Sequence, residues 1–256
     1  KMKPKTKIFG IDTQEAYRKV MAEPDTPLPI NSGNANSLDV KASINAQDYI
    51  RIPGSNAVIS RNELHKGLNW ENTHYALADN GLYMPSPALF MPFYINVRDA
   101  SQGKITLYTA DNAPIPRDEA EDLWKYLSSG HRNGCWTWLD AKFQNTSQKG
   151  MIEFSHNVEG DKSNRKLVGC SEFLEDCIRE DCFVELEFNS QGLPVKKSQA
   201  QKYSQGENIY YYYPRNGTVA RFYACSDRAL LDCDRDPAFS YSSLGVFACA
   251  EGAPKK

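Results

Sequence analysis

Eight residues near the C-terminus have side chains suited to ligand recognition, and they alternate with residues of another kind. In chain order they are Tyr223, Cys225, Leu230, Asp232, Asp234, Asp236, Phe239 and Tyr241. These side chains share no size, charge or polarity. Each can nevertheless be encoded by a codon that differs from the asparagine codon AAC only at its two adenines. We interpret the pattern as the mark of mutagenesis directed at adenines, which predicts that all eight positions vary freely.

The residues between these positions form a more orderly frame. They are small or structural: Ala224, Ser226, Ala229, Leu231, Arg235, Pro237, Ser240 and Ser242. We expect part of the frame to pack into the core, namely Val219, Phe222, Leu231, Val246 and Phe247. Three arginines, Arg221, Arg228 and Arg235, are expected to hold the loops through hydrogen bonds to backbone carbonyls. The eight inserted residues would then point at solvent, where substitutions typically change stability by no more than about 0.5 kcal/mol.

Three of the eight are aspartates at every second position, as in the first half of a calcium loop. Such a loop needs glycine at its sixth position and glutamate at its twelfth, where this chain has Pro237 and Ser243. In an extended strand, the three carboxylates would lie on one face. Because like charges repel, we expect them to be exposed and to suit a cationic ligand. We predict no calcium site.

Residues for other chemistry are scattered. The four histidines fall in different expected elements with no His-x-x-x-His pair: His65, His74, His131 and His156. We therefore expect neither a metal site nor a cofactor. Cys170, Cys177 and Cys182 could act as nucleophiles, but nothing places a histidine and an aspartate beside any of them. The seven cysteines include no Cys-x-x-Cys pair and are expected to be mainly reduced. No catalytic residues are predicted.

From Tyr210 onward, the chain resembles the variable region of proteins diversified by retroelements. This group has a C-type lectin fold and includes phage tropism determinants and archaeal variable proteins. The resemblance is carried by the alternation of frame and inserted residues and by the ending Leu244-Gly245-Val246-Phe247-Ala248. It implies a C-type lectin fold and a ligand-binding surface made by the eight inserted residues.

A second, wider resemblance is to the formylglycine-generating sulfatase-modifying fold. The segments that carry it are Val219-Ala220-Arg221, Arg228-Ala229, Pro237 and Leu244-Gly245-Val246. Phe247-Ala248 stands where that fold usually has arginine. Formylglycine generation also needs a closely spaced pair of metal-binding cysteines, and the separation of Cys225 and Cys233 does not match that pattern. A likeness of fold alone does not establish a function.

Composition excludes several classes of partner. The 256 residues are 41% hydrophobic, which is enough for a core, and 30 basic residues face 32 acidic ones. This near-neutral charge gives no basis for binding nucleic acid. The longest apolar stretch, residues 88–97, is interrupted by Pro92 and is about half the roughly 20 residues of a membrane helix. We expect no membrane insertion and no secretion signal at the start of the chain, and the compartment is left open.

The expected elements place the tail in an α+β, C-type lectin-like fold, with two helices followed by a strand-rich C-terminal half. Residues 1–45 are expected to form an N-terminal arm and linker, with an amphipathic stretch at 12–22. Residues 46–256 would form the domain, with an insertion near 145–180 and the variable region at about 221–243. A hairpin is expected around Pro53-Gly54. Strands are expected at 135–139, 183–188, 209–213, 219–224 and 244–250.

Two helices are expected ahead of these strands. The first covers about 69–79 and would bury a stripe made of Trp70, His74, Leu77 and Ala78. The second begins at Pro116 and ends at 128–130, with a buried face made of Ala120, Leu123, Trp124 and Leu127. In the run Tyr210 to Tyr213, two rings are expected to be buried and two exposed.

The sequence predicts a non-enzymatic, hypervariable ligand-binding protein of receptor or adhesin type, with an unknown protein or surface ligand as its partner. Eight side chains are fewer than half of the roughly 20 to 30 residues a side in a standard interface, so one copy should bind weakly. We therefore expect display in multiple copies. Two alternatives remain open: a formylglycine-generating-enzyme-like oxidoreductase on the same fold, and an invariant structural protein of a virus or cell surface.

Overall fold

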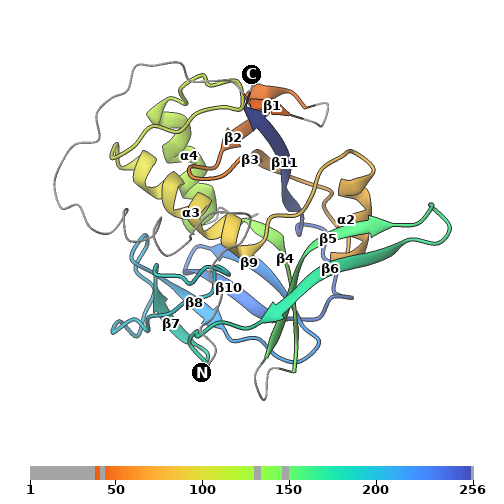
Figure 1. Cartoon of the computed structure of the whole chain (residues 1–256). Helices are drawn as coiled ribbons and strands as arrows, with labels where there is room; N and C mark the ends of the chain where they lie inside the picture. The colour runs from red at the N-terminus through yellow and green to blue at the C-terminus, as the bar shows by residue number, and fades with distance from the viewer. Residues whose placement is uncertain (1–37, 41–43, 130–133, 146–149, 255–256) are drawn as a thin grey trace, which may run out of the picture. The chain divides into compact units, whose positions relative to one another are not determined.

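The computed structural model describes residues 38–40, 44–129, 134–145 and 150–254 (Figure 1). All of the described residues belong to one compact unit. The expected amphipathic stretch at 12–22 lies outside the described residues. Residues 38–40, which we placed in the N-terminal arm, form strand β1 (Leu38–Val40) and pair with the last strand, β11 (Val246–Pro254).

Three α-helices lie in the first half of the described chain. They are α2 (Trp70–Ala78), α3 (Pro87–Ser101) and α4 (Arg117–Ser129), and a short 3-10 helix, η1, spans Ala46–Asp48. Asn69 caps α2, because its side chain accepts a hydrogen bond from the backbone N–H of Asn72 at 2.9 Å. The two expected helices correspond to α2 and α4, and α3 is an addition to our expectation.

Helix α3 contains Pro92, which removes one backbone donor from the middle of the helix. The helix forms because its other side chains are deeply buried. Phe90, Phe93 and Tyr94 are at most 1% exposed and pack against both sheets. Tertiary burial thus outweighs the local cost of the proline. No helix among the described residues is long and apolar enough to cross a membrane.

The strands form two sheets. The smaller has the order β1-β11-β3-β2, with β2 at Tyr49–Arg51 and β3 at Ala57–Leu64. Ile50 pairs with Ile59 across the expected hairpin, and Gly54 in its turn has a positive φ of 77°. The larger sheet has seven strands in the order β6-β5-β4-β9-β10-β8-β7. The α+β class and the strand-rich C-terminal half are therefore confirmed, with three helices instead of two.

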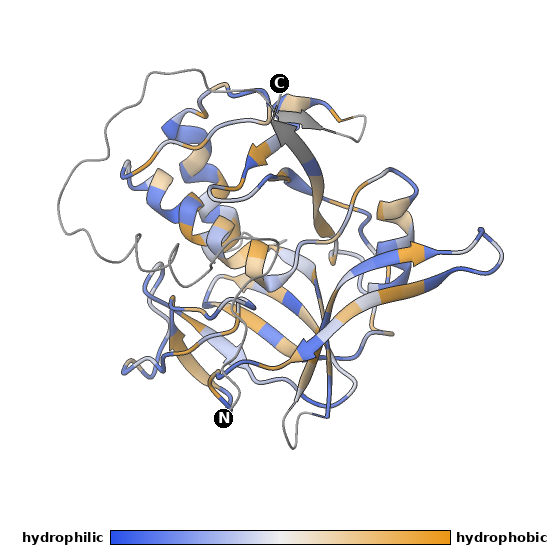
Figure 2. Ribbon diagram, in the orientation of Figure 1, coloured by the Kyte–Doolittle hydropathy of each residue, from blue (hydrophilic) through white to orange (hydrophobic). Residues whose placement is uncertain are grey.

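The seven-stranded sheet contains the residues of greatest interest. Its strands are β4 (Trp136–Gln144), β5 (Met151–Glu159), β6 (Lys166–Phe173), β7 (Cys182–Glu185), β8 (Asn208–Tyr212), β9 (Val219–Cys225) and β10 (Arg228–Arg235). Strands β5 and β6 form an antiparallel hairpin within the predicted insertion. Figure 2 shows hydrophobic and hydrophilic residues alternating along the central strands, as one buried face requires.

The main core lies between this sheet and helices α3 and α4. Phe90 of α3 contacts both Phe222 of β9, at 5.1 Å between ring centroids, and Phe247 of β11, at 6.1 Å. One helix therefore joins the two sheets. A second cluster, around Trp70, Leu77 and Trp138, lies under α2. Ala78, which we placed on the buried stripe of α2, is exposed, and Thr73 is buried instead.

The buried face expected for α4 is present in part. Ala120 and Leu127 are fully buried. Leu123 and Trp124 are partly buried and pack against the edge of the main core. The amphipathic pattern therefore predicts the buried face of α4. The two ends of the predicted stripe are buried most deeply, and its middle is only partly buried.

Candidate binding face

The eight inserted residues lie on two neighbouring strands and on the segment that follows them. Strand β9 carries Tyr223 and Cys225, and β10 carries Leu230, Asp232 and Asp234. The segment 236–243 after β10 carries the other three, which are Asp236, Phe239 and Tyr241. The alternation seen in the sequence therefore falls on one antiparallel strand pair and its continuation.

The register of this pair puts the inserted residues on one face. Tyr223 lies opposite Leu230, and Arg221 lies opposite Asp232. Residues opposite one another on paired strands project to the same side of a sheet. We call this side the outer face, defined as the face of the seven-stranded sheet that carries Tyr223 and Leu230, together with segment 236–243.

Four frame residues occupy the opposite side, whereas the strand alternation puts Val219, Arg221 and Arg228 on the outer face. Phe222, Ala224, Ala229 and Leu231 have no exposed surface and belong to the main core. Because side chains alternate along a strand, a frame that is buried at every second position leaves the intervening residues on the outer face. The frame residues that we expected in the core are all fully buried: Val219, Phe222, Leu231, Val246 and Phe247.

The inserted residues differ in depth. Tyr241, with 52% of its surface exposed, and Asp234 and Asp236 are exposed. Tyr223, Cys225 and Phe239 are half-buried. Leu230 and Asp232 are each only 5% exposed, which contradicts our expectation that all eight point at solvent. The reason is packing on the outer face itself, because Leu230 lies in register between Tyr223 and Tyr210.

The aromatic inserted residues gather around Trp136 of β4. The Trp136 ring is 4.7 Å from the Tyr223 ring and 4.9 Å from the Tyr241 ring, measured between centroids. The guanidinium carbon of Arg221 lies 5.3 Å from the centroid of the Trp136 ring and 5.6 Å from the centroid of the Phe239 ring. These contacts make one connected aromatic patch, and Trp136 is a member that sequence reasoning did not single out. Its position opposite Tyr223 in the sheet could not be read from the chain alone.

Two arginines lie beneath this patch. Arg221 Nε donates a hydrogen bond of 2.8 Å to Asp232 Oδ2, and both side chains are largely buried. Burial lowers the pKa of Arg221, and the neighbouring carboxylate of Asp232 opposes that shift. Arg235 stacks 3.7 Å from the Phe239 centroid, and Arg228 pairs with Asp227. The expected role of Arg221 and Arg228 is therefore wrong: they bind carboxylates rather than holding loops through backbone carbonyls.

Apolar side chains continue across the outer face beyond the variable segment. Tyr210 of β8 lies opposite Leu230, and Phe183 of β7 lies opposite Tyr210. Their rings are 5.0 Å apart, and Tyr212 lies at the same distance from Tyr210. A row in register thus runs from Trp136 to Phe183 over five strands.

The tyrosine run differs from our expectation of two buried and two exposed rings. Tyr211 is fully buried on the inner side, whereas Tyr210, Tyr212 and Tyr213 are half-buried. Tyr210 and Tyr212 lie on the outer face and Tyr211 on the inner side, because successive side chains of a strand point to opposite sides of the sheet. The outer-face rings are half covered because they lie against one another.

The three aspartates do not form a joint cation site. Asp232 is paired with Arg221, Asp234 lies 3.9 Å from Arg215, and Asp236 accepts a backbone hydrogen bond from Ala238 at 2.8 Å. A register shift between Asp232 and Arg235 breaks the strict alternation that would align the carboxylates. The expectation that all three are exposed on one face is therefore wrong for Asp232.

The cysteines offer no paired chemistry. All seven are free thiols. Cys225 is half-buried on the outer face, and Cys233 is fully buried in the main core on the inner side. Because the two side chains lie on opposite sides of the sheet, they cannot bind one ion together. Burial also raises the pKa of Cys233 well above its ordinary value, which keeps the thiol protonated.

Titratable groups gather at a second place that we did not foresee. His74 of α2, Asp140 of β4 and His156 of β5 lie within 4.8 Å of one another, measured between potential ligand atoms. The expectation of no metal site rested on sequence spacing, and the fold brings two of the four histidines together because α2 packs against β5. No sequence signal could have shown this, since the three residues come from three separate elements.

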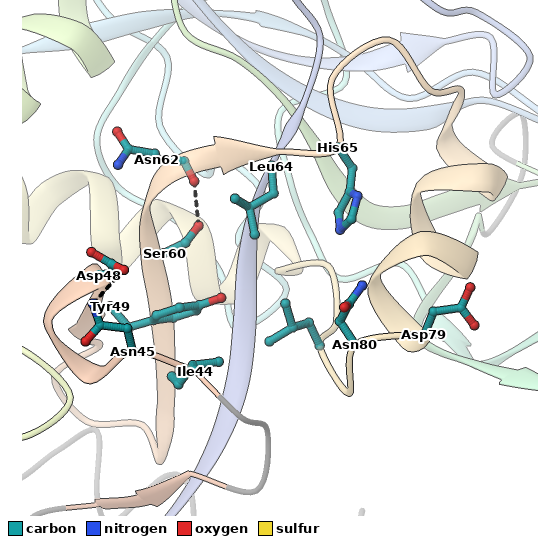
Figure 3. A pocket seen from close by; sticks show the side chains of 11 residues that line it. Ile44, Asn45, Asp48, Tyr49, Ser60, Asn62, Leu64, His65, Asp79 and Asn80 are labelled. Atoms are coloured by element: carbon teal, nitrogen blue, oxygen red, sulfur yellow. Dashed lines mark hydrogen bonds between the residues drawn. The ribbon is translucent and has the colours of Figure 1, made fainter.

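A pocket of about 780 Å³ lies elsewhere on the domain, between the hairpin β2–β3 and the end of α2 (Figure 3). Its lining mixes polar and apolar surface and includes Tyr49, Ser60, His65 and Asn80. In Figure 3 the Ser60 hydroxyl donates to the backbone oxygen of Asn62. None of the eight inserted residues lines this pocket.

Comparison with known proteins finds no matching family model, no similar curated protein and no similar solved structure.

Proposed function

We propose that this protein is a hypervariable ligand-binding protein, of receptor or adhesin type, whose C-terminal positions are diversified by adenine-directed retroelement mutagenesis. We further propose that the domain is a C-type lectin-like fold. The order of elements supports this, because the three helices precede a strand-rich half in which the variable segment comes just before the last strand, β11. The ligand would be a protein or another surface ligand, bound without catalysis.

One observation carries the proposal. Along β9 and β10 the inserted residues, identified from codons, alternate with apolar frame residues on the buried inner side, and the frame residues Arg221 and Arg228 share the outer side with the inserted ones. Leu231 and Phe222 are fully buried on the inner side, while Tyr223 faces outward. A protein that must vary its ligand without losing its fold needs this separation, because buried substitutions cost several kcal/mol and exposed ones little.

The chemistry of the outer face suits recognition of a protein surface. Tyrosine, tryptophan and arginine provide large contact areas with few rotatable bonds or with forked hydrogen-bond donors, and they are enriched at binding hot spots. Here Tyr223, Phe239 and Tyr241 surround Trp136 and Arg221. Asp234 and Asp236 add exposed negative charge at the edge. The aromatic residues would serve as anchors and the aspartates would select among partners.

The size of the variable surface supports display in multiple copies. Of the eight residues, Leu230 and Asp232 are too buried to contact a ligand directly, which leaves six. This is well below the roughly 20 to 30 residues a side of a standard interface, so affinity should come from several copies bound together. A single-site affinity in the picomolar range would contradict this inference.

The decisive experiment is to sequence the DNA that flanks the gene. The proposal expects a nearby non-coding repeat of the last hundred or so bases that carries AAC wherever the gene encodes one of the eight residues. If no such repeat exists and independent isolates keep the eight codons, the proposal fails. The alternatives would then be an oxidoreductase on the same fold and an invariant structural protein.

A protein-level experiment separates the two sides of the sheet. A library with random codons at Tyr223, Asp234, Asp236, Phe239 and Tyr241 should yield mostly folded proteins with differing ligand preferences. A matched library at the five fully buried frame positions Val219, Phe222, Leu231, Val246 and Phe247 should yield mostly unfolded proteins. Equal folding yields from the two libraries would contradict the division of roles.

A further inference from the structure

A buried cluster under α2 has the composition of a metal centre. The His156 Nδ1 atom lies 2.5 Å from Asp140 Oδ1, and His74 Nε2 lies 3.7 Å from the same oxygen. The side chains of all three residues are at most 4% exposed. Asp140 also accepts a hydrogen bond of 2.9 Å at Oδ2 from the backbone N–H of His156, which fixes the carboxylate in place.

One atom in this cluster is unexplained. His74 Nε2 is fully buried and has no hydrogen-bond partner within the described part of the chain. Burying a polar group without a partner typically costs about 1–3 kcal/mol. The atom points towards a carboxylate, yet 3.7 Å is too long for a hydrogen bond. A ligand atom of imidazole at this distance from a carboxylate oxygen is what a shared ion would require.

We propose that His74, Asp140 and His156 bind a single divalent ion of the zinc class, which ties α2 to strands β4 and β5. Two imidazole nitrogens with one carboxylate oxygen favour zinc over magnesium or calcium, which take oxygen ligands. The proposal goes beyond the ligand-binding function, since this cluster contains none of the eight variable residues.

The distances are compatible with such a centre after a small adjustment. Bonds of roughly 2.0 Å in a tetrahedral arrangement place neighbouring ligand atoms about 3.3 Å apart. The pair His74 Nε2 and Asp140 Oδ1, at 3.7 Å, is already close to that value. The pair His156 Nδ1 and Asp140 Oδ1, at 2.5 Å, is a hydrogen bond and would have to open by less than 1 Å as the ion replaces the proton between the two atoms.

A carboxylate outside the cluster is placed to orient one ligand. Glu153 Oε1 lies 3.5 Å from His156 Nε2, the ring nitrogen that faces away from Asp140. Metal-binding histidines usually donate their second N–H to a carboxylate or carbonyl, which sets the ring orientation. Glu153 would be this positioning residue, and it would not bind the ion itself.

The surroundings favour a structural ion over a catalytic one. The Trp70 ring lies 4.4 Å from the His74 ring and 5.0 Å from the His156 ring, with near-perpendicular planes, so it closes one side of the cluster. Trp70 Nε1 in turn donates to the backbone oxygen of Leu139 at 2.9 Å, next to Asp140. Three protein ligands leave the fourth position of a tetrahedral ion to a water molecule, and the burial of all three side chains argues against its exchange for a substrate.

The test uses tag-free, full-length protein that has been stripped with a chelator and then titrated with Zn²⁺ or Co²⁺. We expect one bound ion per chain by elemental analysis, a rise in melting temperature on adding Zn²⁺, and the visible absorption of four-coordinate Co²⁺. No stoichiometric Zn²⁺ together with an unchanged melting temperature would overturn the proposal. The three residues would then form only a hydrogen-bonded network.

Variants make the assignment specific. His74→Gln should lower Zn²⁺ affinity by at least about 100-fold while retaining the fold, because His74 Nε2 has no hydrogen bond to lose. His65→Gln is the matched control, since His65 lies outside the cluster, and it should bind Zn²⁺ as the parent does. Equal Zn²⁺ affinity for His74→Gln and the parent would refute the site.

Should His74→Gln fail to fold, Glu153→Gln provides the alternative. The expected loss is roughly 10- to 100-fold in Zn²⁺ affinity, the usual effect of removing a residue that orients a metal ligand. The Co²⁺ spectrum should keep its four-coordinate form. A Glu153→Gln variant whose affinity matches the parent would overturn the positioning role, and with it the assignment of His156 as a ligand through Nδ1.

Discussion

The pair Arg221–Asp232 gives the sharpest test of how far the outer face can vary. The perturbation is Asp232→Asn, which restores the residue that an unmutated AAC codon would encode. Arg221 Nε and Asp232 Oδ2 are 2.8 Å apart, and their side chains are 11% and 7% exposed. Asparagine keeps the size of the side chain. It also keeps an oxygen for the backbone N–H of Asp234, which now bonds to Asp232 Oδ1 at 3.0 Å.

The cost of this substitution follows from what Arg221 loses. Oδ2 is replaced by an amide nitrogen that meets the Arg221 N–H donor, so a charge-assisted hydrogen bond worth about 1.5–3 kcal/mol is lost. The buried guanidinium also loses its counter-charge, and removing one partner of a buried pair typically costs about 3–5 kcal/mol in total. Because these side chains keep slight exposure, we expect a loss of about 3 kcal/mol in the free energy of unfolding.

Chemical denaturation of the parent and the variant measures this loss directly, and thermal melting should fall by roughly 6–12 °C, given about 2–4 °C per kcal/mol for a domain of this size. Asp234→Asn is the matched control. Its carboxylate is exposed, and its ion pair with Arg215 is long, at 3.9 Å, so we expect the free energy of unfolding to change by no more than about 0.5 kcal/mol. Replacing both members of the buried pair, as Arg221→Met with Asp232→Leu, should recover most of the stability. If Asp232→Asn and Asp234→Asn cost the same, the reasoning is refuted and position 232 varies freely.

Three further outcomes are expected. The Glu63 side chain is buried, and burial raises the pKa of its carboxyl above the ordinary value. A carboxyl whose folded pKa is raised contributes less stability as pH rises from its unfolded pKa through its folded pKa, so Glu63→Gln should gain stability relative to the parent over that pH range in chemical denaturation. A stability difference that does not change with pH would contradict this. At Gly245, an added Cβ would lie 2.8 Å from a backbone oxygen of β3, so Gly245→Ala should cost about 1–3 kcal/mol in unfolding free energy, with an unchanged midpoint as the opposing result. Leu231→Ala, at a fully buried position, should lower the free energy of unfolding by about 2–5 kcal/mol. Tyr241→Ala, at an exposed position, should lower it by about 0.5–1.5 kcal/mol through the lost Trp136 contact. A larger fall in melting temperature for Tyr241→Ala than for Leu231→Ala would contradict the buried role of the frame residues.

Local signals in the sequence account for much of the fold. Pro53-Gly54 predicts the β2–β3 turn because its glycine takes a positive φ, and Asn69 predicts the start of α2 because its side chain caps the helix. Helix α3 could not be predicted in the same way. Pro92 argues against a helix locally, and only the burial of its neighbours between two sheets outweighs that cost.

The candidate sites likewise combine features that local sequence predicts with features that depend on tertiary packing. The outer-face positions follow from a two-residue alternation, which is a property of one strand. Their depths depend on which residues lie opposite, so Leu230 and Asp232 were expected to be exposed although both are buried. The cluster of His74, Asp140 and His156 depends wholly on the packing of three elements. Long-range register is the information that a single sequence lacks.

The variation in depth has a consequence for how diversity would act. At the centre of the outer face, a change at position 232 alters the support beneath the aromatic patch, because Arg221 stacks on Trp136 and lies near Phe239. Such a change would move several contacts with a ligand at once and would lower stability. At the edge, a change at Tyr241 or Asp234 alters only the contacted surface. Selection for folding should therefore narrow the residues found at the centre, while the edge keeps the full range that two mutable adenines allow.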